Sequence, residues 1–359
     1  MDPLTHTLVG ASLAATRLGR KTRLATPALV IGANLPDVDV LSYIRGDDFA
    51  LHFRRGWTHG VPALMVLPAI LAALLMLSAR WRDSDESSGP RSAGWLLALC
   101  YLACFTHPIL DWLNTYGMRW LMPFRDTWFY GDSVFIMDPW LWLILGLGWV
   151  VGRTPARLTG VAISVMAGLV ILLVGSSAPD YLPVVGSIFL ILVLGYFWRP
   201  RDSWFSGHQA ATVGLVLATL YIAAMLSTHS VTTAKIRQRL AEQGIQATDE
   251  LLVGPTPANP LAWDVLVGTG SAYRWGRFDW LHRGMLVMSD AELPAARSSH
   301  HWQTVVTSGQ SPGFIRWVRF PWLEVDETEP GRRIYVMDAR YTRWRGTGFG
   351  GTVFEIPLD

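Results

Sequence analysis

Residues 61–79 of the chain read VPALMVLPAILAALLMLSA, a run without a single charged side chain. A helix of about 20 mostly apolar residues is needed to cross the hydrocarbon core of a bilayer. Four more runs have this character: residues 93–113, 156–175, 183–198 and 208–228. The sequence therefore predicts a membrane protein whose chain crosses the bilayer several times.

Three further segments are weaker candidates for crossings. Residues 139–152 are short but rich in tryptophan, and residues 4–18 and 26–44 are apolar stretches that contain polar side chains. Polar groups in a membrane segment are costly unless they face a protein interior. With these segments included, the prediction is an α-helical multi-pass membrane bundle of about seven or eight helices.

The density of charge rises near residue 228. Residues 1–228 hold 16 basic and 14 acidic residues, and residues 229–359 hold 14 of each in little more than half that length. We expect residues 1–228 to form the membrane domain and residues 229–359 a separate soluble α+β domain. In that domain the sequence predicts a polar helix at 231–243, a turn-rich break at 254–260, and short β-type runs at 263–267, 285–288, 314–320, 333–336 and 351–356.

Net charge and cysteine content argue against a nucleic-acid-binding protein and against a disulfide-rich protein. A net charge of +2 gives no reason to expect a nucleic-acid partner. The two cysteines, Cys100 and Cys104, cannot make a disulfide framework, and we expect them to pack in the interior rather than bind metal. The sequence does not fix the oligomeric state.

Basic residues between the apolar runs indicate an orientation in the cell (inner) membrane. They gather in alternate connections, beginning with residues 17–23 (RLGRKTR), and positive charge favours the cytoplasmic side. With eight crossings, both termini then lie outside, so residues 229–359 are expected to be extracytoplasmic. Arg45, Arg54 and Arg55 fall on the outer side, an exception that a functional role would explain.

Histidine and aspartate residues recur on or beside the apolar segments. They lie in five clusters: residues 4–10 (LTHTLVG), 32–39 (GANLPDVD), 54–60 (RRGWTHG), 105–117 (FTHPILDWLNTYG) and 131–138. Imidazoles and carboxylates together suit Zn²⁺, with Mn²⁺ or Fe²⁺ as alternatives. His107 and Asp111 are four residues apart and share one face of a helix. In the eight-crossing arrangement, the first four clusters meet near the outer membrane face.

One metal site is therefore predicted, with six candidate ligands: His6, Asp37, Asp39, His59, His107 and Asp111. Simpler interpretations exist for some of them. His6 alone is typical of a hydrogen bond between packed helices, and the Asp37/Asp39 pair alone is compatible with a helix cap or a turn. Whether Asp132, Asp138 or His52 joins the site is left open.

At these residues the sequence resembles the membrane-bound metal-dependent hydrolases, multi-pass inner-membrane proteins of bacteria and archaea. The resemblance covers roughly residues 1–140 and rests on four motifs in order: Thr5-His6 with Gly10, Leu35-Pro36-Asp37-Val38-Asp39, Arg55-Gly56-Trp57-Thr58-His59, and His107 to Asp111 running on to Thr115-Tyr116-Gly117. Members often have His directly before the Arg-Gly pair, where this chain has Arg54. The resemblance implies a hydrolase.

The expected function is hydrolysis of a lipid or lipid-linked ester, such as a phosphoester, by a metal-activated water at the outer membrane face. In this scheme Asp39 is the general base, and Arg55 holds an anionic group such as phosphate. Two other classes stay open: a transporter or ion-handling protein, and a structural or regulatory membrane protein with a structural metal. Ligands at one depth favour the enzyme, whereas polar residues stacked through the bilayer favour transport.

The predicted topology can be tested by proteolysis. Because the domain from about Val231 is expected outside, protease added to intact spheroplasts should remove it. Cleavage only in inverted vesicles would show that the topology is reversed and that the site faces the cytoplasm.

Overall fold

The structure is a computed structural model that describes residues 1–82, 90–151, 168, 187, 206–245, 250–326, 332–346 and 349–356. Most of the predicted crossings at 156–175 and 183–198 lie outside the described residues, as do Arg153, Arg157, Arg199 and Arg201. The chain divides into two compact units. The first comprises Met1–Val38, Arg55–Ser227 and Thr256–Pro260, and the second comprises Asp39–Arg54, Thr228–Pro255 and Leu261–Asp359.

The two units are not continuous in sequence, unlike the two predicted domains. Asp39–Arg54, which the sequence analysis placed in the membrane domain, groups with the C-terminal residues in the second unit. This segment includes most of the 3₁₀ helix η2 (Leu35–Arg45) and all of helix α3 (Asp47–Phe53).

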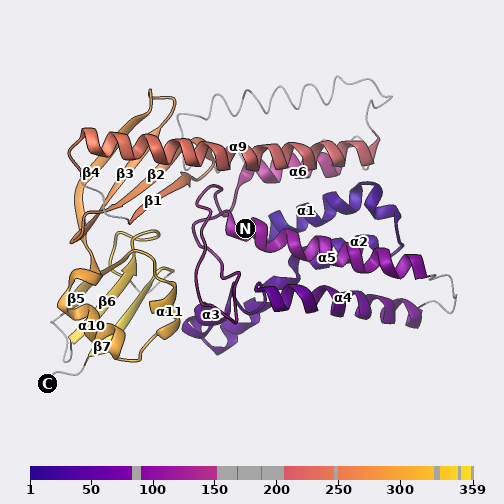
Figure 1. The fold of residues 1–359 in the computed structure, drawn as a ribbon, viewed down its shortest axis with the longest axis horizontal. Coiled ribbons are helices and arrows are strands. Elements are labelled where there is room, and N and C mark those ends of the chain that lie inside the picture. The colour runs from indigo at the N-terminus through magenta and orange to yellow at the C-terminus, as the bar shows by residue number, and fades with distance from the viewer. Residues whose placement is uncertain are drawn as a thin grey trace. The chain divides into compact units, whose positions relative to one another are not determined.

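The first unit is helical. Its helices are α1 (Pro3–Ala15), α2 (Ala25–Asn34), α4 (Val61–Arg82), α5 (Pro90–Trp112), α6 (Pro139–Val150) and the first part of α9 (Gly207–Glu242), with the 3₁₀ helix η1 (Arg17–Arg20) between α1 and α2. Three helices in the described part of the chain are long and apolar enough to cross a membrane: Val61–Trp81, Ser92–Trp112 and Gly207–Glu242. Helix α6 is apolar but shorter. Figure 1 shows α1, α2, α4 and α5 side by side.

Helices α1 and α2 are too short to cross a bilayer on their own. With 13 and 10 residues they measure about 20 and 15 Å, against a hydrocarbon core of about 30 Å. Polar residues set their ends: the Asp2 carboxylate accepts from the amides of Leu4 and Thr5, and α2 ends at Asn34. The predicted bundle of seven or eight membrane helices is thus supported only in part.

Small residues let α2 lie close against α5. The shared core draws on α2, α4 and α5: Ala25, Ala28, Leu29, Ala33, Leu71, Ala72, Leu96, Leu99, Cys100 and Ala103. A Cβ added to Gly32 would lie 2.8 Å from the Cβ of Ala103, so no larger residue fits there. Cys100 and Cys104 are fully buried. This contact brings the end of α2, and with it Asp37, to the last turns of α5.

Helix α9 joins two segments that were predicted separately, a span at 208–228 and a polar helix at 231–243. It runs without a break from Gly207 to Glu242, because no glycine or proline interrupts the sequence between Gly214 and Gly244. Its 36 residues measure about 54 Å, more than the hydrocarbon core requires. A single crossing therefore needs only part of its length.

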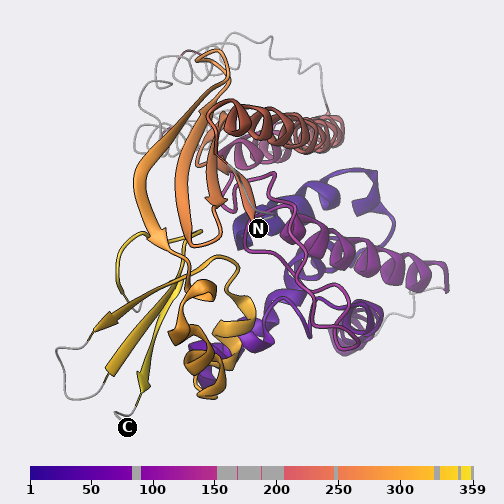
Figure 2. The ribbon, with the colours of Figure 1, turned by 60° about the vertical axis from the view of Figure 1, so that its left-hand side comes forward.

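The second unit is built on two antiparallel sheets (Figure 2). One has the order β1 (Leu251–Thr256), β2 (Asn259–Gly268), β3 (Ala272–Asp279), β4 (Met285–Pro294), and the other has β5 (Pro321–Asp326), β6 (Arg332–Asp338), β7 (Gly351–Ile356). Helices α10 (His300–Thr307) and α11 (Pro312–Trp317) and the 3₁₀ helix η4 (Ala296–Ser298) lie between the sheets in sequence. Both sheets contribute to one core, which contains Leu266, Tyr273, Trp322 and Met337.

One expected β-type run, at 314–320, is instead largely helical. Its first residues belong to α11, which begins at Pro312, and proline is favourable at the start of a helix because its φ is already fixed near the helical value. Phe314 and Trp317 are both buried and three residues apart, which is a helical spacing. The run is apolar, as expected, but its buried residues recur at a helical spacing rather than at the alternation of a strand.

The crossing of α6 and α9 gives a stability test. A Cβ added to Gly214 would lie 2.9 Å from the Cα of Gly148, so Gly214→Ala must push the two helices apart. We expect a loss of about 1–3 kcal/mol, measured as a lower melting temperature in detergent. The matched control is Gly94→Ala in α5, where nothing lies within 4 Å. Equal melting temperatures for the two variants would contradict this packing.

Candidate metal centre

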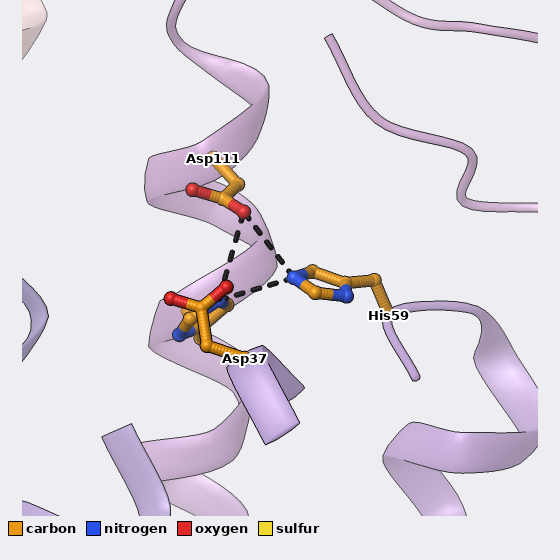
Figure 3. A group of neighbouring side chains, drawn as sticks. Asp37, His59 and Asp111 are labelled. Atoms are coloured by element: carbon orange, nitrogen blue, oxygen red, sulfur yellow. Dashed lines mark hydrogen bonds and ion pairs between the residues drawn. The ribbon is translucent and has the colours of Figure 1, made fainter. Parts of the chain in front are cut away.

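Four side chains from three parts of the first unit converge on one point. His107 and Asp111 lie one turn apart near the end of α5, Asp37 lies at the start of η2, and His59 lies two residues before α4 begins. One ligand atom of each lies within 4.8 Å of the other three. Figure 3 shows Asp37, His59 and Asp111 pointing toward one another. The group could hold a metal ion.

Four of the distances between these atoms lie near those of a coordination shell. The Nε2 atoms of His59 and His107 are 3.1 Å apart, and Asp111 Oδ2 lies 3.2 Å from the first and 3.6 Å from the second. Asp37 Oδ1 lies 3.7 Å from His107 Nε2. A tetrahedral ion bound at about 2.0–2.1 Å places neighbouring ligand atoms about 3.3–3.4 Å apart. The observed separations scatter around that value.

The protonation of His107 follows from its second nitrogen. Nδ1 lies 2.7 Å from the carbonyl oxygen of Ala33 and donates to it, because a carbonyl can only accept. In the neutral ring, Nε2 then carries a lone pair aimed at Nε2 of His59. If the proton of the His59 ring is on Nε2, this 3.1 Å contact is an N–H···N hydrogen bond, and if it is on Nδ1, two lone pairs meet and a cation between them would remove their repulsion. The donor set is therefore compatible with a metal ion.

Burial separates Asp37 from the other three members of the group. The side chains of His59, His107 and Asp111 are fully buried, whereas 19% of the Asp37 side chain is exposed. Burial alone would raise the pKa of Asp37, but a protonated His107, whose Nε2 lies 3.7 Å from Asp37 Oδ1, outweighs burial and holds that pKa below its usual range. Asp37 is therefore ionised, which is the form that binds metals, and it marks the side of the group that solvent reaches.

His6 contacts the group but is not one of its four members. Its ring stacks on His107 with centroids 3.7 Å apart, and its Nε2 lies 3.3 Å from Asp111 Oδ1. Asp111 Oδ2, the other oxygen, faces His59 and His107. The amino group of Met1 also contacts Asp111 Oδ1. His6 is thus placed to orient the carboxylate of Asp111, and its direct ligation of a metal stays a prediction.

Arg55 is bound to protein groups rather than open to an anion. It is 4% exposed, its Nε lies 3.1 Å from Asp111 Oδ2, and its Nη1 donates to Asn114 Oδ1 at 3.1 Å and to the Gly117 carbonyl at 3.3 Å. Its guanidinium also lies over the ring of Tyr116. Arg55 thus compensates the charge of Asp111, and Asn114, which the sequence analysis quoted without assigning a role, holds Arg55 in place.

Asp39 has a different partner from Asp37. Its Oδ1 lies 3.2 Å from Nε of Arg54, and both residues belong to the second unit. Asp39 is 2% exposed and is not among the four converging residues. Arg54, which stands directly before the Arg55-Gly56 pair, thus forms an ion pair with Asp39.

The residues left open by the sequence also have other partners. The Asp138 carboxylate caps α6 and accepts from the Tyr221 hydroxyl at 2.9 Å. His52 Nδ1 lies 3.1 Å from Nη1 of Arg316 in the second unit. Asp132 is buried with a φ of 48°. Among the described residues, none of the three belongs to the group of four.

Comparison with known proteins assigns the chain to a family. The family described as YdjM inner membrane protein matches residues 1–181, which is half of the chain and includes all four converging residues. The chain belongs to the YdjM inner membrane protein family. It is therefore an inner-membrane protein, and its apolar helices agree with that location.

A similar protein is the uncharacterised protein YfhP of Bacillus subtilis (strain 168). It is 25% identical to this YdjM-family chain over 151 residues, which make up 40% of the chain and 43% of YfhP. The match thus spans less than half the length of this relative. No solved structure matches the chain.

The different roles of His107 and His6 predict different metal affinities. His107→Ala removes a converging ligand atom and should abolish stoichiometric zinc binding. His6→Ala removes only the contact that orients Asp111, so affinity should fall about 10–100-fold. Metal content by mass spectrometry and zinc-dependent melting temperatures measure both. The control is His282→Ala, an exposed histidine paired with Asp279. If His6→Ala also abolishes binding, His6 is a direct ligand.

Proposed function

We propose that this protein is a metal-dependent hydrolase of the inner membrane that acts on a lipid or lipid-linked ester, with zinc as the expected metal. The observation that carries the proposal is the convergence of two histidine Nε2 atoms and two carboxylates, of which only Asp37 reaches solvent. A divalent metal at such a site acts as a Lewis acid and lowers the pKa of a bound water toward neutrality.

The place of the ligands along the helices supports a lipid substrate. The span Val61–Trp81 begins two residues after His59, and the span Ser92–Trp112 ends one residue after Asp111. These ends of α4 and α5 lie at one boundary of the apolar region, the level at which lipid headgroups meet protein. All four converging residues share this level, which favours an enzyme over a conducting path through the bilayer.

The residues around the metal ligands have separate tasks in this proposal. His59, His107 and Asp111 would hold a metal ion from the buried side, and Asp37 would hold it on the side that solvent reaches. His6 and Arg55 fix the two oxygens of Asp111, so that its orientation does not change when substrate binds. The ion pair between Arg54 and Asp39 would have to open for Asp39 to act as the general base.

The location of the C-terminal residues belongs to the same proposal. Suppose that the connections carrying the basic residues are cytoplasmic. The C-terminal residues from about 229 then lie outside the cell, and the ends of α4 and α5 that carry the ligands face outward too. A lipid or lipid-linked substrate would then be processed at the outer leaflet. A transporter or a protein with a structural metal remains the alternative, and absence of any hydrolytic activity with metal bound would favour it.

Activity should depend on the metal and on Asp39 in different ways. With a long-chain phosphoester in mixed micelles, chelation should abolish hydrolysis and zinc should restore it. Asp39→Asn should keep the metal and lose about 10²–10⁴-fold in rate if Asp39 is the general base. The controls are His107→Ala, which should lose metal and activity together, and His282→Ala, which should lose neither.

Two outcomes would count against parts of this proposal. If Asp39→Asn retains full activity, Asp39 serves only the ion pair with Arg54 and another group removes the proton. If His107→Ala loses its metal and still hydrolyses the ester at the wild-type rate, the metal-dependent mechanism is wrong.

A further inference from the structure

The first unit contains a pocket of about 560 Å³ between η1 and the start of α9. Its described lining draws on both segments: Thr16, Arg17, Leu18, Lys21, His208, Gln209, Thr212 and Val213. The volume lies within the range of small-molecule sites, about 300–1,000 Å³. Two segments far apart in the sequence therefore form one site.

The pocket lies at the opposite boundary of the apolar region from the four converging residues. Helix α5 crosses that region as the span Ser92–Trp112, and its end carries two of the converging side chains. The η1 side of the pocket lies at its start, where Ser92 Oγ donates to Thr22 Oγ1 at 3.0 Å. The Lys21 ammonium likewise lies 4.4 Å from the centre of the Trp95 ring. The pocket is therefore separate from the candidate metal centre and lies at the level of lipid headgroups.

The charges of the pocket select the sign of the ligand. Arg17 and Lys21 are both exposed, and the described lining contains no carboxylate. Neither lining segment brings an acid nearby in sequence, because residues 3–36 and 206–241 contain no aspartate or glutamate. The Trp95 ring covers one side of the Lys21 ammonium, whose three N–H groups leave donors on the other side. The pocket therefore attracts an anion and repels a cation.

The polar side chains of the lining suit a phosphate group. The planar guanidinium of Arg17 can donate two parallel hydrogen bonds to phosphate oxygens. His208 and Gln209, in the first turn of α9, add further N–H donors. Gln209 Oε1 accepts from the Ser206 amide at 2.9 Å, so its NH₂ group is the part that can donate to a ligand.

An apolar groove of about 320 Å³ adjoins the pocket along α9. Its described lining comes from α6 and α9: Leu143, Ile144, Leu147, Gly148, Val151, Ala210, Val213, Gly214 and Leu217. Val213 lines both the groove and the basic pocket. A free phosphate would use only the pocket, whereas a phospholipid would also place part of an acyl chain in the groove. The pair of features therefore favours a lipid.

We propose that this pocket binds the phosphate headgroup of an anionic phospholipid, with part of one acyl chain in the adjoining groove. Arg17 and Lys21 balance the charge of the phosphate, and His208 and Gln209 donate to its oxygens. A zwitterionic headgroup carries its own ammonium group, which the two basic side chains repel. Basic pockets between membrane helices recognise anionic headgroups in this way. The proposal does not depend on the metal or on hydrolytic activity.

Native mass spectrometry of the purified full-length protein, delipidated in a maltoside detergent, tests the proposal. The protein is titrated with dioleoylphosphatidylglycerol or dioleoylphosphatidylcholine, which share their acyl chains and differ in headgroup charge. We expect phosphatidylglycerol to bind saturably and phosphatidylcholine at least about 10-fold more weakly, because lysine and arginine attract only the net negative lipid. Inorganic phosphate at the same concentration should not displace the bound lipid.

Exposed basic side chains allow variants that leave the fold intact. The double variant Arg17→Gln/Lys21→Gln should weaken phosphatidylglycerol binding about 10-fold or more. Arg17→Gln alone, which keeps the contact of Lys21 with Trp95, should weaken it several-fold. The matched control Arg20→Gln/Arg80→Gln removes the same charge at exposed positions outside the pocket and should bind like wild type.

Four outcomes would overturn the proposal. Phosphatidylglycerol might fail to bind, or phosphatidylcholine bind equally well. Displacement of the lipid by inorganic phosphate would show that the ligand is a free anion. An equal loss of affinity in the pocket and control double variants would show that general surface charge, and not this pocket, attracts the lipid.

Discussion

The Nε2 atoms of two histidines and a buried carboxylate meet at one point in the interior of the helical unit, and much of its local design follows from that constraint. His107 Nδ1 donates to Ala33, which turns Nε2 toward His59 at 3.1 Å. Asp111 Oδ2 lies beside both nitrogens, and its negative charge is compensated by Arg55. A proton or a cation shared among these atoms offsets the repulsion between their lone pairs in a region that water does not reach.

The packing of short helices makes this convergence possible. Because α2 is rich in alanine and carries Gly32 opposite Ala103, it lies against α5 closely enough for its carbonyl at Ala33 to reach His107. The same contact carries Asp37, three residues after Asn34, to the last turns of α5. Small residues in α2 thus position a backbone acceptor and a carboxylate at the same site.

The sequence predicted the long apolar helices and one site built from six residues: His6, Asp37, Asp39, His59, His107 and Asp111. The structure brings four of them together, Asp37, His59, His107 and Asp111. Hydropathy marks α4 and α5, and i,i+4 spacing joins His107 to Asp111. The sequence could not tell which of Asp37 and Asp39 joins the site, since that depends on whether the carboxylate lies beside His107 or beside Arg54. Nor could it foresee that Arg55 is bound by Asn114 and Asp111, or that 39–54 joins the C-terminal residues, because these are contacts between distant segments.

X-ray absorption at the zinc edge of the purified, zinc-loaded protein tests the central claim most directly. The account predicts one zinc per chain, with a shell of nitrogen and oxygen atoms only, at about 2.0–2.1 Å, and the outer-shell scattering of two imidazoles. A protein that holds no stoichiometric metal would contradict it. So would sulfur atoms at about 2.3 Å, which would place the ion at Cys100 and Cys104 instead.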